Sequence, residues 1–129
     1  MQTPRTFARR GSESLSKTSI EVQTREVQQA LVIDIRGEVD LFTSPKMRSA
    51  IVAAFHSAGV SQVAINLGGV NYIDSSGIAT LVEGLQLARS THRRFVLFGL
   101  RKGAREVLEL ARLDKIFDIR ATEVEALGP

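Results

Sequence analysis

The chain has 129 residues, which is enough for one globular domain with its own hydrophobic core. It has no cysteine, so disulfide scaffolds, thiol catalysis and cysteine zinc sites are excluded. The two histidines, His56 and His92, lie far apart in the sequence and argue against a histidine metal site. A single tyrosine and no tryptophan leave few platforms on which nucleic-acid bases could stack.

The net charge of +3 is concentrated at the N-terminus. Residues 1–20 carry four basic side chains and one acidic one, which leaves 13 of the 17 basic and 13 of the 14 acidic side chains for the rest of the chain. A nucleic-acid reader needs a basic face on its folded part, so we predict no direct contact with nucleic acid. One local basic cluster is interpreted as a solvated surface: Arg89, Arg93, Arg94, Arg101, Lys102 and Arg105.

The first twenty residues lack apolar periodicity and are rich in Ser, Thr and Arg. This composition predicts a disordered basic tail over residues 1–20, followed by a single domain over residues 21–129. Arg9 and Arg10 are not followed by the apolar run of an export signal, and no stretch approaches the roughly 18 apolar residues of a membrane span. We therefore expect a cytoplasmic protein that does not insert into membranes.

From residue 21 onward the chain becomes periodic. Alternating apolar residues predict strands over Glu21–Val27 and Leu31–Arg36, joined by a hairpin turn at Gln28–Ala30. Ser44 followed by proline indicates the start of a helix, in which the serine caps free backbone N–H groups, and Gly59 indicates its end.

The second half of the chain repeats this alternation of strand and helix. Val63–Leu67 predicts a central strand, and Gly68, Gly69 and Asn71 predict a loop after it. A helix to about Ser90 follows, with apolar residues at Ile78, Leu81, Val82 and Leu85. The last predicted elements are a buried strand, a helix and an edge strand, over Phe95–Phe98, Arg101–Arg112 and Phe117–Arg120.

This order predicts an α/β fold, in which a mixed, mostly parallel β-sheet is flanked by about three or four α-helices. Ligands and partners of such sheets meet the loops at the carboxyl ends of the strands. Three loops are expected there, over Gly37–Ser44, Gly68–Ser76 and Gly99–Lys102.

Enzyme signatures are missing from the sequence. The phosphate-binding GxxxxGK[ST], the dinucleotide-binding GxGxxG and the nucleophile elbow GxSxG do not occur. The predicted topology places His56 and His92 away from these loops, so neither is positioned to activate Ser75 or Ser76. We predict that the chain is not an enzyme and that it holds no metal and no cofactor.

The turn Asp74-Ser75-Ser76-Gly77 offers a different chemistry. A serine hydroxyl at a helix N-terminus lies beside free N–H groups and the positive end of the helix dipole, where a phosphate is favourably placed. The same four residues can also be read as redundant caps of a tight strand-to-helix turn. The residues alone leave both interpretations open.

In this chain one helix follows the run Gly37–Asp40 (GEVD) and another opens with the run Asn71–Ala79 (NYIDSSGIA). These runs resemble the STAS domain of bacterial anti-sigma factor antagonists, over about residues 21–120. The resemblance implies that the unphosphorylated chain binds an anti-sigma factor that is also a serine kinase, and that phosphorylation breaks the complex. A PP2C-type, metal-dependent phosphatase would reset the switch, and the nucleotide and magnesium would belong to the kinase.

By the same resemblance Ser76 is the phosphoacceptor, with Ser75 as the alternative. The residues implied in partner binding are Asp40, Leu41, Thr43, Tyr72, Asp74, Ser75, Gly77, Ile78 and Ala79. We expect one exposed face to carry Asp40, Leu41, Thr43, Tyr72, Ser76, Ile78 and Ala79. STAS domains also serve as adaptor subunits of bacterial lipid-transport ABC complexes, so the alternative partner is a transporter ATPase.

Overall fold

The computed structural model describes residues 19–129, so residues 1–18 of the tail predicted over residues 1–20 lie outside the described residues. The first strand begins at Ile20, one residue before the predicted strand start at Glu21, and the Ile20 side chain is buried. The described residues form β1 (Ile20–Val27), β2 (Ala30–Val39), α1 (Ser44–Phe55), β3 (Gln62–Ile73), α2 (Ser75–Thr91), β4 (Arg94–Phe98), α3 (Lys102–Leu110), β5 (Asp118–Arg120) and α4 (Glu123–Leu127).

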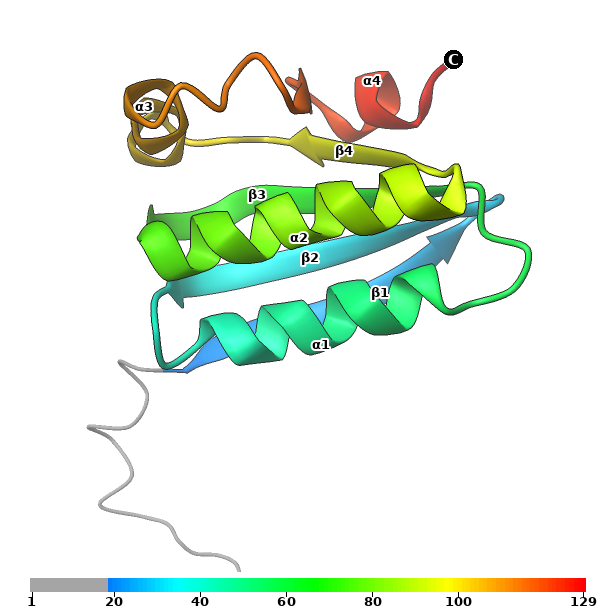
Figure 1. The fold of residues 1–129 in the computed structure, drawn as a ribbon, viewed down its shortest axis with the longest axis horizontal. Helices are drawn as coiled ribbons and strands as arrows, with labels where there is room; N and C mark the ends of the chain where they lie inside the picture. The colour runs from blue at the N-terminus through cyan, green and yellow to red at the C-terminus, as the bar shows by residue number, and fades with distance from the viewer. Residues whose placement is uncertain (1–18) are drawn as a thin grey trace, which may run out of the picture.

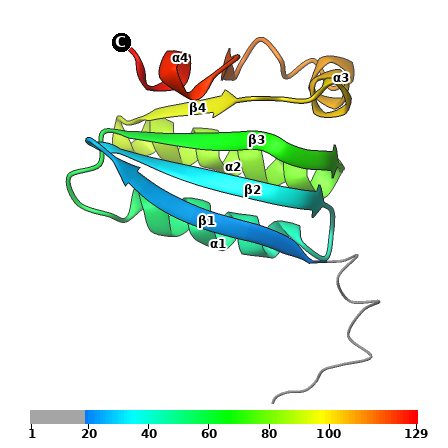
Figure 2. The same cartoon turned by 180° about the vertical axis from the view of Figure 1, so that it is seen from behind.

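The strands form a five-stranded sheet whose spatial order follows the chain order, β1-β2-β3-β4-β5. β1 is antiparallel to β2, and the other neighbours are parallel, which confirms the predicted mixed, mostly parallel sheet. Helices α1 and α2 cover one face of this sheet, in front of it in Figure 1 and behind it in Figure 2. α4 lies beyond β4, apart from α1 and α2 (Figure 2).

The main hydrophobic core lies between the sheet and α1, α2 and α3. Within it the rings of Phe55, Phe95 and Phe117 form a row, with centroids 5.9 Å and 6.4 Å apart. A smaller cluster forms on the other face, where Ala126 of α4 packs with buried side chains of the three central strands: Val32, Ala64, Val96 and Phe98. Both faces of the sheet therefore hold apolar side chains, as expected for parallel strands.

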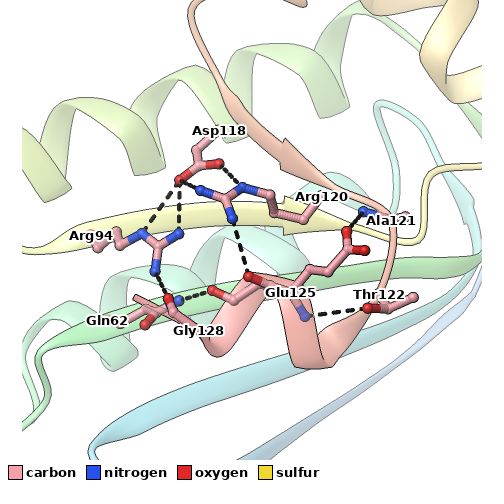
Figure 3. A network of polar contacts seen from close by, with 9 residues as sticks. Gln62, Arg94, Asp118, Arg120, Ala121, Thr122, Glu125 and Gly128 are labelled. Atoms are coloured by element: carbon pink, nitrogen blue, oxygen red, sulfur yellow. Dashed lines mark hydrogen bonds and ion pairs between the residues drawn. The ribbon is translucent and has the colours of Figure 1, made fainter.

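A polar network ties the C-terminal segment to the edge of the sheet (Figure 3). The guanidinium of Arg94 pairs with the carboxylate of Asp118 at 3.1 Å and donates to the carbonyl of Gly128 at 2.7 Å. Arg120 approaches the same carboxylate at 2.6 Å. Burial by itself raises the pKa of Asp118, but the hydrogen bonds from Arg120 and Arg94 outweigh it and lower that pKa.

Two strands run further than the sequence predicts. β2 continues through Gly37 to its end at Val39, and β3 continues through Gly68 and Gly69, where a loop was predicted. Register shifts between β2 and β3 accompany these glycines, and the φ of Gly37 is +121°. A Cβ at Gly69 would lie 3.0 Å from the carbonyl oxygen of Ile35. The glycines mark bulges and a close approach of two strands, so the loop prediction was wrong.

Candidate functional site

The carboxyl ends of the parallel strands gather three connections at one end of the molecule, which we call the carboxyl edge. They are Asp40–Thr43 after β2, Asp74 after β3, and Gly99–Arg101 after β4. Figure 1 shows the β2–α1 connection, the start of α2 and helix α3 at this same end. The first two connections are shorter than the predicted loops because β2 and β3 are longer.

Asp74 forms the turn into α2. Its Oδ1 accepts hydrogen bonds from the backbone N–H groups of Ser76 at 2.8 Å and Gly77 at 3.3 Å. Its own N–H donates to the carbonyl of Val39 at 3.0 Å, which ties the turn to the end of β2. Of the candidate caps in this turn, Asp74 is therefore the residue that caps α2.

The capping role of Asp74 leaves the two serine hydroxyls uncommitted. Neither the Ser75 nor the Ser76 hydroxyl has a hydrogen-bond partner within residues 19–129. Ser75 is exposed and Ser76 is half-buried, in the first turn of a helix of 17 residues. The N–H groups of Ser76 and Gly77 are already bound by Asp74, so it is the positive end of the helix dipole that favours an added anion here.

Gly77 lets the start of α2 lie directly on the strand ends. A Cβ at this position would lie 2.5 Å from Cγ1 of Ile73 and 2.7 Å from Cγ1 of Val39, both of which are buried. Gly77 is itself buried. Gly77 was predicted from the sequence to lie in the partner-binding surface. The structure corrects this prediction, because Gly77 is buried and allows close packing beneath the turn.

The connection between β2 and α1 is held by a hydrogen-bonded turn. The Oδ1 atom of Asp40 accepts from the N–H groups of Phe42 at 2.9 Å and Thr43 at 3.0 Å. The Thr43 hydroxyl donates to the carbonyl of Glu38 at 2.7 Å and accepts from the Asp40 N–H at 2.9 Å. These bonds leave Leu41 and Phe42 at the outer tip of the turn, 67% and 78% exposed.

The helix start at Ser44 is confirmed, but the predicted cap there is wrong. The cap position is Thr43, and its side chain makes no capping hydrogen bond to α1 because its hydroxyl holds the preceding turn. Ser44 is the first helical residue and is buried.

The structure corrects two members of the predicted exposed face. Thr43 and Ile78 are only 3% and 7% exposed, because Thr43 holds the turn and Ile78 packs into the core as its helical spacing allows. Tyr72 is 51% exposed, and Ala79 is also exposed. Sequence reasoning missed Phe42, since one apolar residue in a loop carries no periodic signal.

The two histidines cap the far ends of the helices. His56 is the C-cap of α1 and His92 is the C-cap of α2, so both lie at the end of the sheet opposite Ser75 and Ser76. Within residues 19–129 no three His, Asp or Glu side chains gather to hold a metal ion. A pocket of about 530 Å³ lies on the sheet face away from α1 and α2, beside Gln23, Asp34 and Asn66.

The predicted basic cluster does not form a single face. Arg93 and Arg94 precede or open β4, whereas Arg101 and Lys102 follow it, so the strand separates them. Arg101 donates from Nη1 to Oδ1 of Asn71 at 2.8 Å, next to Tyr72.

None of the helices in the described part of the chain has the length and hydropathy of a bilayer span.

Comparison with known proteins agrees with this architecture. The family profile of the STAS domain matches residues 21–126. The anti-sigma-B factor antagonist of Listeria monocytogenes is 31% identical over 110 residues, which cover 85% of this chain and 95% of the relative.

Solved structures extend the comparison. The crystal structure of an anti-sigma factor antagonist from Mycobacterium paratuberculosis is similar with a TM-score of 0.77 at 26% identity, over 85% of this chain and 92% of that one. The Bacillus cell fate determinant SpoIIAA in its phosphorylated form has the same fold, with a TM-score of 0.65 at 23% identity, over 83% and 96% of the two chains. The chain belongs to the STAS domain family, among the anti-sigma factor antagonists, which confirms the resemblance seen in its sequence.

Proposed function

We propose that this chain is a phosphorylation-controlled partner switch. Its unphosphorylated form binds an anti-sigma factor that is a serine kinase, and phosphorylation of Ser76 releases that partner. The observation that carries the proposal is an uncommitted serine hydroxyl in the first turn of α2, at the same carboxyl edge as the exposed side chains of Leu41 and Tyr72. The names of the relatives favour this function over an adaptor of a transporter ATPase.

A phosphate on Ser76 would act through charge. It would add about 1.5–2 negative charges next to the carboxylate of Asp74 and replace a neutral hydroxyl by a strongly hydrated dianion. The positive end of the α2 dipole favours the phosphate, so the modification is compatible with the fold. A partner docked over this turn would have to accommodate and desolvate that dianion, which weakens the complex.

In this proposal, other proteins carry out the transfer and removal of the phosphoryl group. The kinase supplies nucleotide and magnesium, a PP2C-type phosphatase resets the switch, and this chain presents the substrate serine without being an enzyme. A relative supports this assignment, since SpoIIAA is known in a phosphorylated form. We expect the exchange to take place in the cytoplasm.

Mass spectrometry tests the acceptor. The purified chain is incubated with ATP and each anti-sigma factor of the organism that encodes it, and the Ser76→Ala and Ser75→Ala variants are treated in parallel. We expect phosphate on the wild type and on Ser75→Ala, and none on Ser76→Ala. Phosphate on Ser76→Ala at the wild-type level would contradict the assignment of Ser76.

A further inference from the structure

The tip of the β2–α1 turn exposes two large apolar side chains in sequence. Phe42 is 78% exposed and Leu41 67%, and Tyr72, whose neighbour in the sheet is Glu38, is 51% exposed. Water around an exposed phenyl ring is unfavourable, so an aromatic residue at such a tip gains free energy when a partner covers it. All three residues lie at the carboxyl edge, and we call these exposed side chains the tip patch.

The backbone that carries the tip patch is already ordered. Asp40 Oδ1 accepts from the N–H groups of Phe42 and Thr43, and the Asp40 carbonyl accepts from Ser44 N–H at 2.8 Å. The Thr43 hydroxyl fixes the other side of the turn on the carbonyl of Glu38. Binding therefore orders little additional backbone, so more of the burial of the Phe42 ring appears as affinity.

Acidic groups border the tip patch on the strand side. Glu38 is exposed and forms no ion pair within residues 19–129. The carboxylates of Asp40 and Asp74 hold their own turns by accepting backbone N–H groups, and both remain half-exposed. The nearest cation in α1, Lys46, donates to the carbonyl of Ile20 at 3.0 Å, toward β1. Within the described residues, Glu38 therefore gives this side of the patch an unpaired carboxylate, while the guanidinium of Arg101 is held by Asn71, next to Tyr72.

We propose that Phe42 is the anchor of the partner interface, and that the partner offers an apolar pocket whose rim facing Glu38 is basic. The inference rests on the proposed function and specifies the chemistry of the partner at the same edge. Anchors of this kind are aromatic, central and surrounded by a polar rim. Complementary charge at the rim accelerates association and makes the affinity depend on salt.

Titration calorimetry tests the anchor. Wild type, Phe42→Ala, Phe42→Leu and Val124→Ala are titrated against each purified anti-sigma factor of the same organism. Val124 is the matched control, since it is an equally exposed apolar residue on α4. We expect Phe42→Ala to weaken binding roughly 30-fold or more, Phe42→Leu to recover part of this loss, and Val124→Ala to change nothing. All four melting temperatures should agree, because none of these side chains is buried.

The outcomes separate the two proposals. If wild type binds none of the anti-sigma factors, the proposed function fails and the anchor fails with it. If wild type binds but Phe42→Ala binds within threefold of it, only the anchor is refuted. Glu38→Lys tests the rim: we expect weaker binding with a reduced salt dependence, and tighter binding would show that the partner rim is acidic.

Discussion

Replacing Gly77 with alanine should destabilise the domain, although alanine is the better helix former. The added Cβ would lie 2.5 Å from Cγ1 of Ile73 and 2.7 Å from Cγ1 of Val39, distances that real Cβ atoms do not show. Both neighbours belong to buried strand ends, so relief requires a shift of α2 or of the core.

The magnitude follows from two opposing terms. Overpacking a core by one methyl group costs about 1–3 kcal/mol, and alanine regains up to about 1 kcal/mol of helix propensity. We expect a net loss of about 1–2 kcal/mol in the free energy of unfolding, which lowers the melting temperature of a domain of this size by roughly 4–8 °C. Urea unfolding followed by circular dichroism, together with a thermal melt, measures both quantities.

Gly103 provides the matched control. It lies exposed in the first turn of α3, and a Cβ there would meet no atom closer than 4.0 Å. Gly103→Ala should therefore be neutral or stabilise the domain by up to about 1 kcal/mol. Equal stability of Gly77→Ala and wild type would refute the argument that this glycine is required by packing.

Three further predictions concern the cap, the outer sheet face and the N-terminal residues. Asp74→Ala should lower the free energy of unfolding by about 1 kcal/mol, whereas Ser76→Ala should change it by less than about 0.5 kcal/mol; a chemical unfolding series that ranks them the other way would contradict the assignment of the cap. The hydrogen bond from Arg25 lowers the pKa of Asp34 in the folded domain below its ordinary value of 3.8. The ionised Asp34 side chain therefore stabilises the domain above pH 3.8, and this stabilisation is lost as the pH falls through the lowered pKa. Asp34→Asn should therefore flatten the acid limb of a stability–pH curve below about pH 4, and an unchanged limb would exclude this origin. Removal of residues 1–18 should leave the melting temperature unchanged, because their sequence has no apolar face to bury; a lower melting temperature would show that they pack on the domain.

The type and order of the elements could be predicted because their periodicity reflects which face is buried. Ile78 and Leu81 repeat at helical spacing and pack into the core, and Phe95–Phe98 is apolar throughout and forms a fully buried strand. Their order along the chain was enough to predict the sheet and the connections that meet at its carboxyl edge.

Features that depend on contacts between distant segments could not be predicted. Gly68 and Gly69 have the composition of a loop, and only the neighbouring strand shows that they form a bulged strand. The guanidinium of Arg25 binds the carboxylate of Glu123, 98 residues away in the sequence. No local sequence pattern predicts such an ion pair. Of three residues that all favour helix caps, the one that caps α2 is Asp74, whose N–H is held by the carbonyl of Val39 in β2.

The close packing beneath Gly77 also bears on the speed of the proposed switch. Since the start of α2 has no room to move toward the strand ends, we expect a phosphate on Ser76 to act at the surface and not by pushing α2 into the sheet. No slow rearrangement then separates the chemical step from its effect on the partner. In the proposed switch, the rate of partner exchange would then depend on the rates of phosphorylation, dephosphorylation and partner dissociation.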